Sequence, residues 1–376
     1  MARIFDPEIW AAVPFHFWSV IFFAFGSIVG SFLNVCIYRM PLELSVIAPP
    51  SHCPHCKYSI PWYLNIPLFT WLFLGGKCAN CRAPISSRYF FVELLTGLAF
   101  LACWLAVGRT SVWLALAYCL VLAGFIVATF IDFEHFIIPD EITIGGMVAG
   151  AVCSFAVPAL HGTDSHAVAL FRSFVGMAVG AGVVYAVVRI GKLLFGRQQI
   201  ELPENTRIIF TETGVVLPDR EVPFEELFYR KTDVVTMEAK TVELIDRCYA
   251  RTTVRLMQEK LFIGDDEMDP EPIKQMEVVA DRIVLPREAM GFGDVKFMGA
   301  IGAFLGWKAA AFSLMVSSIL GAIVGLILIV LRKQEWSSRL PYGPYIAVAA
   351  VIWMFAGPAL VDRWIQFIGQ LGPGGG

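Results

Sequence analysis

The chain has 376 residues, of which 57% are hydrophobic and 16% charged, and its formal net charge is −3. Soluble globular proteins of this length carry more charge and less apolar sequence, so the composition excludes that class and predicts a polytopic membrane protein. We expect membrane lipid, and no nucleic acid, among its partners.

About eight apolar stretches are long enough to cross a bilayer as helices, for which roughly 20 residues are needed. No basic segment with a small-residue cleavage site precedes the first stretch, so we expect a retained span. Most Lys and Arg residues at the ends of the predicted spans lie on the same side of the membrane as the loop that follows the first span. The positive-inside rule then predicts that this loop is cytoplasmic. The predicted spans cover residues 17–38, 88–107, 111–131, 142–160, 169–194, 293–306, 309–331 and 343–368.

The expected fold is an all-α polytopic membrane protein with two non-membrane parts. The first is a small cytoplasmic module similar to a zinc ribbon, and the second is an α+β cytoplasmic insert with strands near 207–210 and 215–217 and a helix over 238–261. The insert is net acidic, whereas the rest of the chain is net basic. The predicted domains are an N-terminal span (1–38), the tetracysteine module (39–87), spans two to five (88–196), the insert (197–290) and spans six to eight (291–376).

Four cysteines in two C-x-x-C motifs predict a structural zinc site, with Cys53, Cys56, Cys78 and Cys81 as ligands. Each motif offers two thiolates at the spacing that a tetrahedral ion requires, and four sulfurs leave no open position for a substrate. A disulfide pair is the alternative, but the cytoplasm keeps thiols reduced.

Asp132 and Asp294 lie at the polar ends of two different predicted spans, both on the cytoplasmic side in the predicted topology. Placing a carboxylate at the edge of the hydrocarbon region costs free energy, so such a residue is usually paired with another group or has a function. Two adjacent carboxyls can activate water and protonate a carbonyl, as peptide hydrolysis requires. The alternative for Asp294 is a helix cap.

Other residues near these aspartates are candidates for supporting roles. Gly291 and Gly293 would let a peptide backbone approach Asp294. Lys296 would orient a carboxylate or a substrate carbonyl, or extend to the interface. Glu93 is a candidate functional carboxylate or a partner of a nearby basic residue. Asp140 is expected to cap the fourth span, and Glu134 to be solvated.

Several segments together resemble the bacterial prepilin leader peptidases, which belong to the GxGD-type intramembrane aspartyl proteases. The matching segments are 30–35, the two C-x-x-C motifs, 88–93, 131–140, 291–296 and 341–345. The resemblance implies Asp132 and Asp294 as the catalytic pair. It also implies S-adenosylmethionine as a cofactor for N-methylation, with Gly75, Gly76, Lys77 and Glu93 as contributors. The large insert departs from the family pattern, in which a short loop connects these spans.

The sequence therefore predicts an aspartyl endopeptidase in a bacterial inner membrane that removes leader peptides from type IV prepilins or type II secretion pseudopilins at the cytoplasmic face, followed by N-methylation. The acidic insert would recruit the basic leader electrostatically. A proton-coupled transporter is one alternative, although its carboxylates would lie near the bilayer midplane. A zinc scaffold without catalysis is the other.

Overall fold

The computed structural model describes residues 14–195, 197–211, 213–218, 221–228, 233–244, 246–270, 273–286, 291–331 and 340–371. The chain divides into two compact units. One comprises Met1–Tyr185 and Gly291–Gly376, and the other Ala186–Met290.

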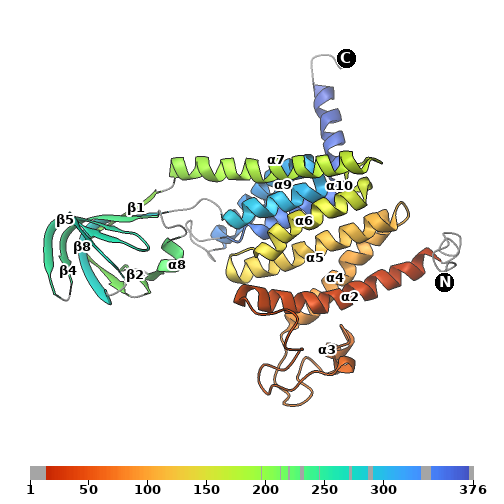
Figure 1. Cartoon of the computed structure of the whole chain (residues 1–376), viewed down its shortest axis with the longest axis horizontal. Coiled ribbons are helices and arrows are strands. Elements are labelled where there is room, and N and C mark those ends of the chain that lie inside the picture. Colours follow the sequence, from red (N-terminus) through yellow and green to blue (C-terminus); the bar gives the residue numbers. More distant parts are fainter. Residues whose placement is uncertain are drawn as a thin grey trace. The chain divides into compact units, whose positions relative to one another are not determined.

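Long apolar helices build the first unit (Figure 1). α2 packs on α4, α4 on α5, and α9 against both α6 and α10. The helices are α2 (Phe15–Arg39), α3 (Phe69–Phe73), α4 (Ser87–Val107), α5 (Val112–His135), α6 (Asp140–Ala156), α7 (His166–Phe195), α9 (Phe292–Val330) and α10 (Gly343–Leu371), with short 3-10 turns at Met40–Leu42, Trp62–Leu64 and Pro158–His161.

The predicted count of eight spans is not confirmed. Among the described residues, 6 helices are long and apolar enough to cross a membrane, which makes the chain a multi-pass membrane protein. The stretch predicted at 142–160 corresponds to α6, which has only 17 residues. The stretches predicted at 293–306 and 309–331 correspond to the two helices that make up α9 and meet at a kink at Gly306 (φ 82°).

The break at Gly306 is accommodated by hydroxyl groups from neighbouring helices. A non-helical residue at this position removes the bond that the carbonyl of Ala303 would accept one turn later. The hydroxyls of Ser154 and Ser173 donate to that carbonyl instead, at 3.0 and 2.7 Å. All three residues are buried, so water cannot reach the carbonyl of Ala303. The two hydroxyls therefore replace its missing backbone donor.

Glycines allow α7 to approach α9 closely. A Cβ atom on Gly176 would lie 2.1 Å from the carbonyl oxygen of Gly302, and one on Gly180 would lie 2.3 Å from that of Met298. This is the small-residue packing that membrane helices use where the hydrophobic effect does not drive their association.

The second unit is an antiparallel sheet of strand order β3-β2-β1-β8-β4-β5-β6-β7. Its buried core includes Ile208, Met237, Val254 and Ile283. The strands are β1 (Arg197–Thr211), β2 (Gly214–Val216), β3 (Glu221–Pro223), β4 (Val235–Glu243), β5 (Cys248–Leu256), β6 (Leu261–Ile263), β7 (Asp266–Met268) and β8 (Gln275–Pro286), with a short helix α8 (Phe224–Leu227).

The strands predicted near 207–210 and 215–217 are confirmed, but the helix predicted over 238–261 is wrong. That segment forms β4 and β5, paired in antiparallel register from Val235 and Leu256 to Glu243 and Cys248. The buried positions of β4 follow an approximate period of two, with Val235, Met237 and Ala239 inside the sheet. Burial against the sheet has overridden the weak helical periodicity of the sequence.

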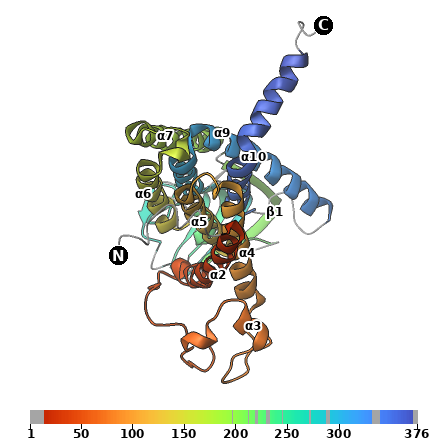
Figure 2. The same cartoon turned by 90° about the vertical axis from the view of Figure 1, so that its right-hand side faces the viewer.

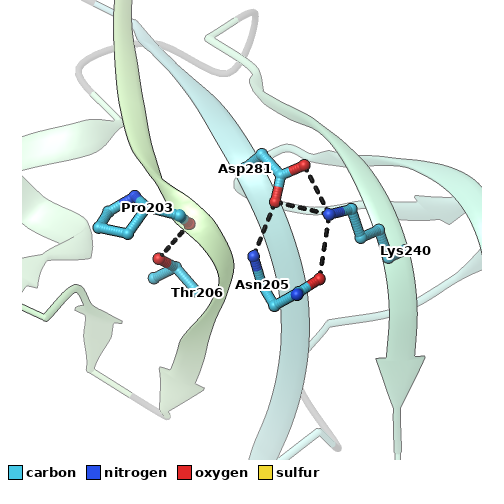
Figure 3. A network of polar contacts seen from close by, with 5 residues as sticks. All are labelled: Pro203, Asn205, Thr206, Lys240 and Asp281. Atoms are coloured by element: carbon cyan, nitrogen blue, oxygen red, sulfur yellow. Dashed lines mark hydrogen bonds and ion pairs between the residues drawn. The ribbon is translucent and has the colours of Figure 1, made fainter.

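Polar side chains fill an irregularity where β1 passes β8 (Figure 3). The ammonium of Lys240 donates to the side chains of Asn205 and Asp281, at 3.0 and 2.9 Å, and the backbone N–H of Asn205 also donates to Asp281. The Lys240 side chain, through its hydrogen bond, lowers the pKa of the Asp281 carboxyl.

Candidate active site and metal centre

Asp132 and Asp294 lie at the same end of the helical unit, where α5 ends and α9 begins. The rings of Phe125 and Phe297 meet edge to face with centroids 5.5 Å apart and join the two helices beside the site. Both carboxylates are secluded from solvent, with exposed fractions of 5% and 8%. Ile138 lies close to both, since a Cβ atom on Gly293, next to Asp294, would be 3.5 Å from its Cβ, and one on Gly343, beside Asp132, 3.1 Å from its Cδ1. The fold therefore brings the two predicted aspartates together.

Gly343 is a third member of this site. Its backbone N–H donates a 2.8 Å hydrogen bond to Oδ2 of Asp132. It is the first residue of α10, and an amide in a first helical turn has no partner inside its own helix. Segment 341–345 contributed to the sequence prediction only through the family resemblance. The Gly-Pro pair at the start of an apolar stretch is typical of a helix start, but it does not show which carboxylate the first backbone N–H will meet.

Asp294 lies in the first turn of its own helix. Gly291 is the N-cap of α9, and a Cβ atom there would lie 3.5 Å from Oδ2 of Asp294, so this carboxylate turns back toward the start of α9. A carboxylate in the third helical position that reaches back to the N-cap amide is half of a capping box. The capping interpretation of Asp294 therefore stays a prediction beside the catalytic one. Gly293 faces the chain's own backbone, since a Cβ there would lie 3.6 Å from the amide nitrogen of Ile138.

Basic residues around the aspartates pair with other carboxylates. Lys296 forms an ion pair with Asp140 at the start of α6, and its ammonium lies 5.5 Å from the centroid of the Phe292 ring. The expectation that Asp140 caps α6 is wrong, since Pro139 is the N-cap and no side chain caps it. Glu134 is not simply solvated, because it pairs with Arg88 and so joins the end of α5 to the start of α4.

The residues expected to contribute to methyl transfer lie in the cysteine module and, for Glu93, in α4. Gly75 and Gly76 both have positive φ, 60° and 66°. Glu93 is buried and accepts a 2.8 Å hydrogen bond from the backbone N–H of Leu68. Lys77 forms an isolated β-bridge with Pro84. Glu93 thus pairs with a backbone amide, whereas Arg88, the basic residue at the start of its own helix, pairs with Glu134.

The cysteine motifs form two equivalent turns. In each, the N–H of the first cysteine donates to the carbonyl five residues later, at 2.9 Å for Cys53 and 2.8 Å for Cys78. In each, the residue after the second cysteine has positive φ, 58° at Lys57 and 59° at Arg82.

The four sulfurs fit a tetrahedral ion. All lie within 4.8 Å of one another, with Cys53 and Cys81 Sγ 3.8 Å apart and Cys56 and Cys78 Sγ 4.0 Å apart. Ligands about 2.3 Å from a zinc ion are separated by about 3.8 Å. The hydrogen bond from the Tyr58 backbone lowers the pKa of the Cys56 thiol to about 6. The Ala83 backbone lowers the pKa of Cys81, but burial and the other cysteines outweigh it and raise that pKa to about 11.

Two family models match the chain. The bacterial peptidase A24 N-terminal domain matches residues 24–107, which include α4 and all four cysteines. The type IV leader peptidase family matches residues 119–200 and 275–326, which include both aspartates. The chain belongs to the type IV leader peptidase family. The resemblance inferred from the motifs is thus confirmed, and the family match skips most of the β-sheet unit, at residues 201–274.

Relatives with leader peptidase names match the chain over different lengths. The prepilin leader peptidase/N-methyltransferase of Aeromonas hydrophila is 27% identical over 95% of this chain and 96% of its own length. The protein of the same name from Myxococcus xanthus is 39% identical over 50% of this chain and 60% of its own length. The type 4 prepilin-like proteins leader peptide-processing enzyme of Escherichia coli is 42% identical over 35% of this chain. No solved structure matches the chain.

Proposed function

We propose that this enzyme removes the leader peptide from type IV prepilins or type II secretion pseudopilins, with Asp132 and Asp294 as its catalytic pair. The observation that carries the proposal is the burial of these two carboxylates at one end of the helical unit, where α5 ends and α9 begins. A midplane transport site is disfavoured because both residues lie in terminal helical turns.

The chemistry needs one proton shared by two carboxyl groups. The ionised carboxylate takes a proton from water, and the resulting nucleophile attacks the carbonyl carbon of the scissile peptide bond. The protonated carboxyl donates to the carbonyl oxygen, and a proton then passes to the leaving amine as the carbon–nitrogen bond breaks. The protonation steps belong to the pair rather than to either residue. Gly343 holds Asp132 in place throughout.

The proposed location is a bacterial inner membrane, with the aspartates at the cytoplasmic face. The bias of Lys and Arg toward this end of the spans supports that orientation. A prepilin has an apolar segment directly after its leader, so the cleavage point of a membrane-inserted substrate would lie at the interface, at the depth of the two aspartates.

Two cofactors belong to the proposal. Zinc would be held by Cys53, Cys56, Cys78 and Cys81 and would stabilise a module with little core of its own. S-adenosylmethionine would supply a methyl group to the α-amine that cleavage exposes. The names of the relatives support methylation, and Gly75, Gly76, Lys77 and Glu93 are the candidate residues for it.

One experiment tests the catalytic pair. A substrate with a Gly-Phe leader junction is co-expressed with the wild type, with Asp132→Asn or Asp294→Asn, and with Asp164→Asn as a control at an exposed loop position. We expect both pair variants to lose cleavage at unchanged protein levels and the control to retain it. Cleavage by either pair variant would remove that carboxylate from the mechanism. The mass of the mature N-terminus, about 14 Da higher for one methyl group, reports methylation.

A further inference from the structure

Residues 58–76 form an unusually apolar part of the cysteine module. They contain no charged side chain and lie between Lys57 and Lys77. Several of their large side chains project away from the protein, with exposed fractions of 82% for Trp62, 75% for Phe69 and 87% for Phe73. An apolar surface of this kind marks an interaction site rather than a surface in water.

Contacts with α4 fix the course of this segment. The N–H of Leu68 donates to Glu93, the ring of Trp71 lies 5.3 Å from that of Phe90, and the N–H of Ile85 donates to the carbonyl of Gly76 at 2.7 Å. The segment from Leu68 to Gly76 therefore runs antiparallel along the first turns of α4. Figures 1 and 2 show α3 below α2, on the outside of the helical unit.

The depth of Leu68 follows from the position of Glu93. A Cβ on Gly30 of α2 would lie 2.7 Å from the Cα of Glu93, so these two residues are level. A helix rises about 1.5 Å per residue, which puts Glu93 roughly 9 Å from the start of α4 and roughly 13 Å from the end of α2. Leu68 is therefore level with the apolar part of two membrane spans.

The backbone at Leu68 is suited to an apolar environment. Leu68 is the N-cap residue of α3 and has φ 63°, so its N–H has no helical partner. Inside a bilayer every backbone polar group needs a partner within the protein. The buried carboxylate of Glu93 supplies that partner, at 2.8 Å.

We propose that residues 62–74 form a re-entrant segment of the bilayer, with phospholipid acyl chains as its partner. Phe69, Leu72 and Phe73 occupy one face of α3 and are exposed, as are the apolar side chains of Leu95 and Leu98 on the membrane span α4. Trp62 and Tyr63 then lie near the headgroups, where such side chains concentrate. In this proposal only the two C-x-x-C turns of the module remain in water, which differs from the expectation that all of 39–87 is cytoplasmic.

Photo-crosslinking in the full-length protein tests this proposal. p-Benzoylphenylalanine replaces Phe73, with Leu98 as the lipid-facing reference and Asp164 as the water-facing reference, and cells are irradiated before purification and mass spectrometry. We expect a phospholipid adduct at position 73 with a yield similar to that at 98, and none at 164. If position 98 gives the adduct and position 73 does not, the proposal is wrong, whether position 73 then labels a co-expressed prepilin, another protein or nothing.

The hydrogen bond of Glu93 gives a second, matched test. Glu93→Gln keeps an acceptor oxygen for the N–H of Leu68, whereas Glu93→Ala leaves that amide without its partner. We expect the adduct at position 73 to persist in the Gln variant and to fall roughly two- to tenfold in the Ala variant, the population change that one net hydrogen bond produces. Equal yields in both variants would show that Glu93 does not hold the segment in the bilayer.

Discussion

The backbone N–H of Gly343 donates a hydrogen bond to the carboxylate of Asp132, 2.8 Å away and 211 residues distant in sequence. It joins the last turn of α5 to the first turn of α10. Because the donor belongs to the main chain, the orientation of the carboxylate depends on how the two helices pack and not on a side-chain rotamer. A Cβ on Gly343 would lie 2.8 Å from Oδ2 of Asp132, so the space beside the carboxylate is already filled.

Replacing Gly343 should disturb catalysis more than folding. In Gly343→Ala the methyl group must displace the carboxylate of Asp132, and a misplacement of about 1 Å costs on the order of 100-fold in rate. Initial rates of leader removal in proteoliposomes measure the effect. Gly124→Ala is the control on the same helix as Asp132, since its Cβ would meet nothing within 4 Å. Rates within twofold of each other for the two variants would contradict the argument.

The contact between α7 and α9 should be sensitive to one added methyl group. Gly180→Ala inserts a Cβ 2.3 Å from the carbonyl oxygen of Met298, whereas Gly182→Ala meets nothing within 4 Å. Both changes favour helix, but only the first overpacks, at a cost of about 1–3 kcal/mol. We expect a lower thermal unfolding temperature in detergent for Gly180→Ala alone. Equal unfolding temperatures would rule out close packing of these helices.

Metal content should depend on the four clustered cysteines. The purified wild type is expected to hold about one zinc ion per chain, as a four-sulfur site binds. Cys53→Ser should lose it, and Cys248→Ser, at an exposed position in the insert, should retain it. Elemental analysis measures both. A strong chelator should also make segment 39–87 more sensitive to protease, because metal binding and folding are coupled. Zinc retained by Cys53→Ser would argue against the site.

Alternate residues of β8 should stabilise the core of the sheet unit. Ile283 is fully buried, whereas the neighbouring Arg282 is exposed. Ile283→Ala should lower the free energy of unfolding of this unit by about 2–5 kcal/mol, and Arg282→Ala should change it by less than about 0.5 kcal/mol. Hydrogen exchange of the β8 amides in the full chain reports the difference. Similar exchange in both variants would mean that Ile283 does not stabilise the unit.

Electrostatic recruitment by the acidic insert predicts a dependence on salt. Arg197 and Pro286 are register partners on β1 and β8, so the ends of the insert are adjacent and residues 200–285 can be replaced by a short linker. We expect the deletion to slow processing of a basic leader at low ionic strength and to have less effect at high ionic strength, where charges are screened. An unchanged rate at low salt would exclude recruitment by charge.

The sequence was sufficient for features that depend on local pattern. Long apolar stretches predicted α2, α4, α5 and α10, because a helix is the simplest way to satisfy backbone groups in lipid. The sequence was a less reliable guide where tertiary contacts determine the secondary structure. The mixed pattern of residues 238–261 indicated a helix, but pairing with β8 and burial of alternate side chains made it two strands. Local propensity is too weak to resist such burial.

The sequence by itself determined which side chains could do chemistry: two aspartates at span ends and four cysteines at metal-ligand spacing. Only the tertiary structure decided how they are held. It paired Lys296 with Asp140 and Arg88 with Glu134, and it set Gly343 against Asp132 and Leu68 against Glu93. The last two partners are backbone amides. Every residue except proline carries one, so an amide leaves no mark in the sequence and acquires a role only when packing brings a carboxylate to it.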